Sequence, residues 1–163
     1  MAAPRHGDPL RLRATDEDDL RVLAAHLQDA VVQVCDMAYL PSHHRFAMMV
    51  NRFMWEDLQP HVGPHADDEA PYRRTRTAVH FEGVLGAKTQ AINLAHKEAV
   101  AVLMTMTFAS SADGAGVLQM TFAGGGAIRL DLECLEIYLT DMGQPWPTKN
   151  LPQHDASGGE PLG

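Results

Sequence analysis

Apolar residues recur along the chain at two spacings, and each spacing predicts a different kind of element. The first spacing, which follows one face of a helix, is kept by Leu20, Leu23, Leu27 and Val31. Thr15, followed by the acidic residues Asp16, Glu17 and Asp18, is typical of a helix start. We therefore expect an amphipathic helix of about three turns, preceded by a short strand at residues 10–13.

The second spacing is the alternation of apolar and polar residues that is typical of β-strands. It is found at residues 31–40, 45–55, 76–88, 99–108, 118–122 and 128–130. Short turns separate several of these segments, and one of the turns is a run of three glycines at 124–126. Antiparallel pairing is therefore expected.

The helical spacing returns near the C-terminus. Leu132, Leu135, Leu139 and Met142 follow it, and Gly143 stands where a helix would end. Residues 132–142 are therefore expected to form a second helix.

These elements predict an α+β fold. We expect a mainly antiparallel, strongly bent β-sheet or partly open barrel of about seven strands, with one helix after the first strand and a C-terminal capping helix. This order of elements resembles the pleckstrin-homology-like barrel, by analogy of fold alone. The alternative is an open antiparallel sheet covered on one face by both helices.

The expected organisation is one domain over residues 9–143. Residues 1–8 are expected to be a disordered tail, and so are residues 144–163, which are rich in proline and glycine. Residues 56–74 combine several prolines with an acidic run, which predicts a long surface loop.

Charge and composition narrow the classes of function. The 163 residues include 13 Lys and Arg against 21 Asp and Glu, a formal net charge of −8, which argues against binding nucleic acid or an anionic membrane. No apolar run has the length of a membrane span, and the start does not resemble a signal peptide, so we expect a cytoplasmic protein. The two cysteines, Cys35 and Cys134, are expected to be small buried hydrophobic residues.

The stretch from Asn51 to Glu56 is the first candidate for a binding site. Arg52 interrupts the apolar alternation of its strand, which predicts a β-bulge near Asn51, and Trp55 and Glu56 follow closely. A bulge could direct Asn51, Arg52, Trp55 and Glu56 into a pocket. The alternative is a strand end at which Trp55 caps the core and Arg52 pairs with Glu56 or with the acidic residues of the helix.

Three arginines form the second candidate. Arg73, Arg74 and Arg76 close the acidic loop, and they could bind phosphate or an anionic lipid. Pairing with acidic groups of the same chain, or a solvated edge, is the favoured interpretation.

No cofactor or metal is expected. His61 and His65 flank Gly63 and Pro64, which prevent the helix that would place both imidazoles on one face, and His43–His44 lies in a turn. No catalytic residue is predicted, because no serine or cysteine stands in a recognisable nucleophile motif.

Three segments carry a resemblance to a known family. They are residues 27–32, residues 51–56 and residues 122–136, the last of which reads Phe-Ala-Gly-Gly-Gly-Ala-Ile-Arg-Leu-Asp-Leu-Glu-Cys-Leu-Glu. The chain resembles, over residues 9–149, a small alphaproteobacterial family catalogued as domain of unknown function 2948. The resemblance implies no activity, substrate, cofactor or catalytic residue.

The sequence therefore favours a non-catalytic cytoplasmic binding or protein-interaction module, although it leaves enzymatic activity open. Its partner would be another protein or a second copy of the chain, and not a nucleic acid. One alternative is a small-molecule-binding protein or enzyme with a pocket near residues 51–56. A second alternative is a weak phosphate or anionic-lipid binder that uses the three arginines.

Overall fold

The computed structural model of the chain describes residues 8–58, 72–149 and 151–152. In these residues it shows nine strands, one α-helix and three short 3₁₀ helices. Their order is β1 (Arg11–Ala14), α1 (Glu17–Leu27), β2 (Val31–Leu40), η1 (Pro41–His43), β3 (Arg45–Phe53), η2 (Trp55–Leu58), β4 (Tyr72–Glu82), β5 (Val84–Gln90), β6 (Val100–Ser110), η3 (Ala112–Gly114), β7 (Gly116–Phe122), β8 (Ala127–Leu132) and β9 (Ile137–Thr148).

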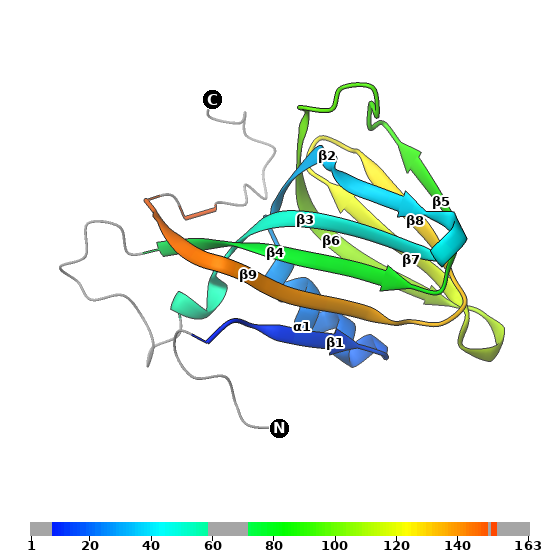
Figure 1. The fold of residues 1–163 in the computed structure, drawn as a ribbon. Coiled ribbons are helices and arrows are strands. Elements are labelled where there is room, and N and C mark those ends of the chain that lie inside the picture. The colour runs from blue at the N-terminus through cyan, green and yellow to red at the C-terminus, as the bar shows by residue number, and fades with distance from the viewer. Residues whose placement is uncertain (1–7, 59–71, 150, 153–163) are drawn as a thin grey trace.

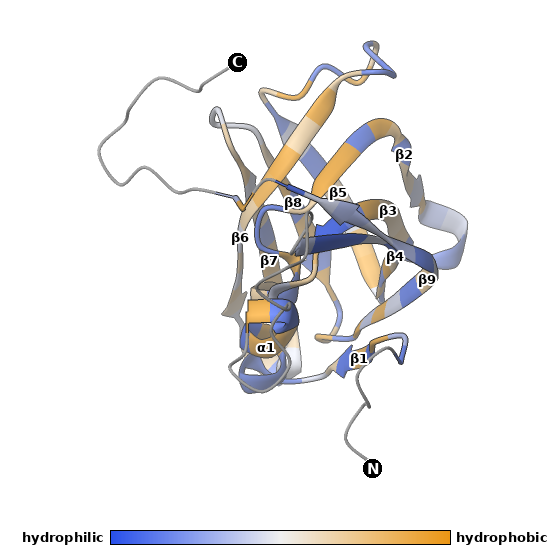
Figure 2. Ribbon diagram, turned by 90° about the vertical axis from the view of Figure 1, so that its left-hand side faces the viewer, coloured by the Kyte–Doolittle hydropathy of each residue, from blue (hydrophilic) through white to orange (hydrophobic). Residues whose placement is uncertain are grey.

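All nine strands form one open antiparallel sheet in the order β1-β9-β4-β3-β2-β6-β7-β8-β5. Strand β2 joins its two halves, because residues 31–33 pair with β6 on one side while residues 31–32 and 37–40 pair with β3 on the other. The sheet bends at this junction, so that β6, β7 and β8 lie behind β2, β3 and β4 in Figure 1. Figure 2 shows the halves from the side, with α1 near their lower ends.

The core lies between the two halves of the sheet and is closed on one side by α1. Along β3, residues Phe46, Met48 and Val50 are buried, in alternation with half-exposed neighbours. Helix α1 contacts β1, β3 and β6, and its buried residues are Leu20, Leu23 and Leu27. Each fully buried apolar side chain of this kind stabilises the fold by about 1.5–3 kcal/mol relative to its exposure.

The predicted C-terminal capping helix is wrong, because residues 137–148 form strand β9. Ile137 and Leu139 point into the core in strand alternation, so Leu139 fits both a helical and a strand spacing. Strand pairing decides in favour of the strand, because β9 is hydrogen-bonded to β1 on one side and to β4 on the other. The likeness to a pleckstrin-homology-like barrel depended on this helix and is therefore also wrong. The sheet is open.

The prediction of about seven strands is also wrong. The missing strands are β9 and β5, since the expected strand 76–88 is in fact two strands. Gly83 divides them with a positive φ of 67°, and Val84 then donates its amide to the His44 carbonyl. After this turn β5 pairs with β8, in the other half of the sheet.

The β-bulge predicted near Asn51 is absent. The pairing of β3 with β4 runs without interruption from Arg45 to Phe53, and Arg52 occupies a regular inward position opposite Thr75. The break in the apolar pattern is therefore a buried charge in an ordinary strand. An irregularity occurs instead in β2, between Val32 and Met37, where the register against β3 shifts.

The structure also tests several smaller expectations. The glycine turn is confirmed: Gly124 and Gly125 have positive φ in the β7–β8 connection. Residues 144–148, expected in the C-terminal tail, belong to β9, and residues 146–148 pair with β4. Cys35 and Cys134 are exposed, so their predicted burial is wrong. Residues 1–7 and 153–163, and residues 59–71 of the predicted loop, lie outside the described residues.

The β6–β7 hairpin allows a test of the fold. A Cβ added at Gly116 would lie 2.5 Å from the Ala109 carbonyl oxygen and 2.6 Å from the Phe108 ring, whereas one at Gly86 meets only the flexible Asp131 carboxylate, at 3.2 Å. We expect Gly116→Ala to lower the free energy of unfolding by about 1–3 kcal/mol, measured by urea denaturation. Gly86→Ala is the control and should cost clearly less. Equal costs would contradict this hairpin packing.

Candidate functional site

Arg52, the residue that breaks the apolar pattern, lies at the centre of a buried network. Its side chain is 0% exposed. Arg52 donates from Nε to Asp141 Oδ1 at 2.8 Å and from Nη2 to Asp141 Oδ2 at 2.7 Å. It also donates to both carboxylate oxygens of Glu56, each at 2.9 Å. Two bidentate carboxylates therefore surround one guanidinium.

Asp141 connects this network to two more strands. Its carboxylate also accepts the hydroxyl hydrogen of Thr77 on β4, at 2.8 Å. It accepts the backbone amide of Leu10, just before β1, at 3.0 Å. Together with Arg52 on β3, these contacts join four neighbouring strands around one charge. Neutralising and hydrogen-bonding every buried charge is what makes such a cluster tolerable in a core.

The network changes the acid–base properties of its members. Burial alone would raise the pKa values of Asp141 and Glu56, but the hydrogen bonds and charge of Arg52 lower both below their ordinary values. Burial lowers the pKa of His26, although the charge of Glu56 opposes this shift. The His26 Nδ1 atom is buried with no hydrogen-bond partner among the described residues.

The four residues of the first candidate site do not face one common pocket, and they have different partners. Arg52 and Glu56 bind each other, which is the alternative that the sequence left open. Asn51 lies on the opposite face of β3, where its side-chain oxygen accepts from Arg76 at 3.3 Å. The indole of Trp55 donates to the Gln28 carbonyl at 2.9 Å. These contacts hold parts of the fold together. A ligand-binding role for these residues stays a prediction.

The three arginines of the second candidate site have separate partners. Arg73 forms two hydrogen bonds with the buried carboxylate of Asp57, at 3.1 and 2.8 Å. Arg74 donates to the Asn51 carbonyl at 3.1 Å, and Arg76 pairs with Asp36 at 3.3 Å. Pairing with acidic groups of the chain is therefore confirmed for Arg73 and Arg76, whereas Arg74 donates to backbone carbonyls.

Side chains of the types that bind metal ions do not gather in the described residues. No group of three or more His, Cys, Asp or Glu side chains that could hold a metal ion occurs in residues 8–58, 72–149 and 151–152. His61 and His65 lie outside these residues.

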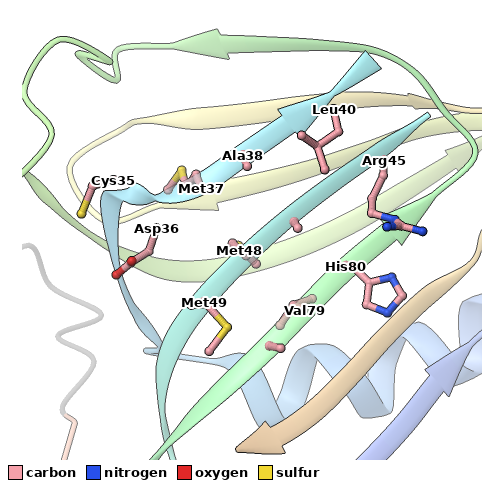
Figure 3. Close-up of a pocket in the computed structure, with 12 residues that line it drawn as sticks. Cys35, Asp36, Met37, Ala38, Leu40, Arg45, Met48, Met49, Val79 and His80 are labelled. Carbon is pink, nitrogen blue, oxygen red and sulfur yellow. The ribbon is translucent and has the colours of Figure 1, made fainter. Parts of the chain in front are cut away.

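A groove of about 660 Å³ lies on the outer face of β2, β3 and β4. Figure 3 shows its lining side chains on these three neighbouring strands. The lining residues are Cys35, Asp36, Met37, Ala38, Leu40, Arg45, Ala47, Met48, Met49, Ala78, Val79 and His80. Ala38, Ala47 and Ala78 are small, which leaves space between the larger side chains. We refer to this feature as the β2–β4 groove.

One end of the β2–β4 groove carries a hydrogen-bonded cluster centred on Glu82. Arg45 Nε donates to Glu82 Oε1 at 2.6 Å, and the Nδ1 atom of His80 lies 2.9 Å from the same oxygen. Burial alone would raise the pKa of Glu82, but the hydrogen bonds from Arg45 and His80 lower it. The His80 ring stacks on Tyr138, with the ring centroids 4.7 Å apart.

The other end of the β2–β4 groove carries Cys35 and Asp36 (Figure 3). Both lie in the irregular part of β2, where the amide of Cys35 bonds to the Lys97 carbonyl instead of to β3. The irregularity therefore places these two residues at the end of the groove. The polar ends and the apolar middle together suit an elongated amphipathic molecule.

Sequence reasoning missed this groove, although one signal was available. Ala47 and Met49 alternate with the buried residues of β3, so this strand has apolar residues on both faces. That pattern is typical of a strand whose outer face is also covered or binds something.

Comparison with known proteins identifies the family of this chain. A family model described as "Protein of unknown function (DUF2948)" matches residues 10–154. The chain belongs to this family. The resemblance inferred from the sequence is thereby confirmed. Neither the curated proteins nor the solved structures contain a match.

The DUF2948 chain has only one described α-helix, α1, and it contains 11 residues. Among the described residues, no helix is both long and apolar enough to cross a membrane.

The buried network of this DUF2948 protein predicts a large effect of Arg52→Met. The substitution leaves the carboxylates of Asp141 and Glu56 without their counter-charge, so we expect a loss of about 3–5 kcal/mol in the free energy of unfolding, measured by urea denaturation. Arg21→Met is the matched control, because Arg21 forms an exposed pair with Asp18. A similar small loss in both variants would contradict the role of the network.

Acid should also destabilise the protein through this network. The pKa values of Asp141 and Glu56 are lowered from 3.8 and 4.5, so the unfolded state takes up protons first as the pH falls. The stabilisation is therefore present above about pH 4.5 and lost as the pH falls through the folded-state values. The lowered pKa of His26 acts in the same direction just below its ordinary value of 6.5.

Urea denaturation at a series of pH values measures this dependence. We expect the free energy of unfolding to fall steadily from about pH 5 to pH 3, and Arg52→Met to flatten that slope. The variant His26→Gln should flatten only the region near pH 6. A wild-type slope that survives Arg52→Met unchanged would contradict the assignment.

Proposed function

We propose that this protein is a non-catalytic binding protein that takes a small amphipathic ligand into the β2–β4 groove. The observation that carries the proposal is the groove of about 660 Å³, with an apolar middle and polar ends. Its volume lies within the range of about 300–1,000 Å³ that is usual for small-molecule sites. The proposed function thus moves the binding site away from residues 51–56.

We also propose that the protein acts in the cytoplasm. Its two cysteines, Cys35 and Cys134, are both unpaired and exposed. Unpaired exposed thiols are typical of proteins in a reducing compartment.

Docking of a protein partner has weaker support. Of the two terminal strands of the sheet, β1 spans only Arg11–Ala14 and carries two arginines, whereas β5 is longer and exposes Leu85. Lys88 lies in β5, and a lysine on an edge strand opposes pairing with another strand. The β2–β4 groove is therefore the better candidate.

Filling the groove tests the proposed function. The probe is octan-1-ol, whose binding is followed through backbone amide shifts in two-dimensional NMR. We expect shifts confined to β2, β3 and β4, and we expect Ala47→Phe to weaken binding about tenfold or more, because the new ring occupies the ligand's space.

Ala109→Phe is the matched control, because Ala109 is an exposed strand residue of β6 outside the groove. It should bind octan-1-ol as the wild type does. If no amide of β2–β4 responds to the probe, or if Ala47→Phe binds it unchanged, the proposed function is wrong.

A further inference from the structure

We propose that the ligand of the β2–β4 groove is a small amphipathic carboxylate, whose carboxylate is bound by Arg45. This inference rests on the proposed function and adds the chemical class of the ligand. It follows from the hydrogen-bonding groups at the two ends of the groove and from the charges beside them.

Arg45 has donors that the described structure does not use. Its Nε donates to Glu82, and its side chain is 43% exposed. Its two terminal nitrogens have no hydrogen-bond partner among the described residues. Planar guanidinium donors match the two oxygens of a carboxylate, and such charge-assisted hydrogen bonds are about twice as strong as neutral ones.

His80 provides a second group at the same end. Its Nδ1 is engaged with Glu82, and its ring is held against Tyr138. Because Nδ1 carries the hydrogen that Glu82 accepts, the Nε2 atom of the neutral ring is an acceptor and does not donate to a carboxylate. Figure 3 shows the Arg45 and His80 side chains together at one end of the groove. Glu82 therefore orients both side chains, and the two terminal nitrogens of Arg45 stay available as donors.

Asp36 at the opposite end sets the direction of the ligand. Its carboxylate pairs with Arg76 at 3.3 Å, and its side chain is 25% exposed. Asp36 thereby occupies one terminal nitrogen of Arg76, and Asn51 accepts from the other. Both terminal nitrogens of the arginine at this end are therefore engaged, unlike those of Arg45. The apolar tail would therefore run over Ala47 and Ala78 towards Asp36, with the head group at Arg45.

A small molecule fits the groove better than an extended peptide does. The floor strand β3 is hydrogen-bonded to β2 on one side and to β4 on the other. β3 thus offers no free edge to which a peptide strand could be added. Recognition must come from side chains, and these supply one anion-binding end and one apolar middle.

Three probes of equal chain length test the head group: sodium octanoate, octan-1-ol and octylammonium chloride, titrated into the full chain by two-dimensional NMR. We expect octanoate to bind about tenfold or more tightly than octan-1-ol, and octylammonium to bind most weakly. Arg45→Gln should remove the advantage of octanoate while octan-1-ol still binds, which shows that the groove is intact.

Arg13→Gln is the matched control. Arg13 is exposed and packs over Tyr138 outside the groove, so its loss removes the same charge from the same face of the sheet. It should keep the preference for octanoate. The carboxylate assignment is wrong if octanoate binds no tighter than octan-1-ol, or if its advantage survives Arg45→Gln.

Two further outcomes would also overturn the inference. If a peptide with an apolar C-terminal residue binds the groove more tightly than octanoate, the occupant is a protein segment. If none of the three probes binds, the proposed function fails together with the inference, whereas binding of octan-1-ol alone leaves the proposed function standing.

Discussion

The buried guanidinium of Arg52 is the interaction on which the first half of the sheet depends. Arg52 is enclosed by the carboxylates of Asp141 and Glu56, and Asp141 also accepts from Thr77 and from the Leu10 amide. These contacts join β3, β9 and β4 to the segment before β1. A charge buried without its partners is strongly destabilising, so an arrangement that separates these strands is penalised.

The same register determines which side chains face outwards. Because side chains alternate along a strand, a slip of one residue would turn every inward residue of β3 to the outer face. With Arg52 inside, the outward positions hold Asn51, Met49, Ala47 and Arg45. On β4 the partners of Ala47 and Arg45 are His80 and Glu82. The buried network and the β2–β4 groove therefore lie on opposite faces of the same strands, and both depend on the same strand register.

The sequence correctly predicted those elements that depend only on residues close together in the chain. Helix α1, the β2–β3 pair and the glycine turn all lie close to their expected places, because helix spacing, strand alternation and glycine conformation depend on neighbouring residues. Strand β9 was missed because Leu139 satisfies both spacings, and only its pairing with distant strands decides. Arg52 was noticed but misinterpreted as a bulge, since its partner Asp141 lies 89 residues away.

A double-mutant cycle on Arg52 and Asp141 tests the central claim most directly. Unfolding free energies are measured for Arg52→Met, Asp141→Leu and the double variant. Arg52→Met leaves the Asp141 carboxylate buried without its counter-charge, and Asp141→Leu leaves Arg52 with Glu56 alone, whereas the double variant removes both members of the Arg52–Asp141 pair. The account predicts a double variant that is more stable than the sum of the two losses implies, with a coupling of about 2–3 kcal/mol. Additive losses would show that the two side chains do not act on each other, and would contradict the account.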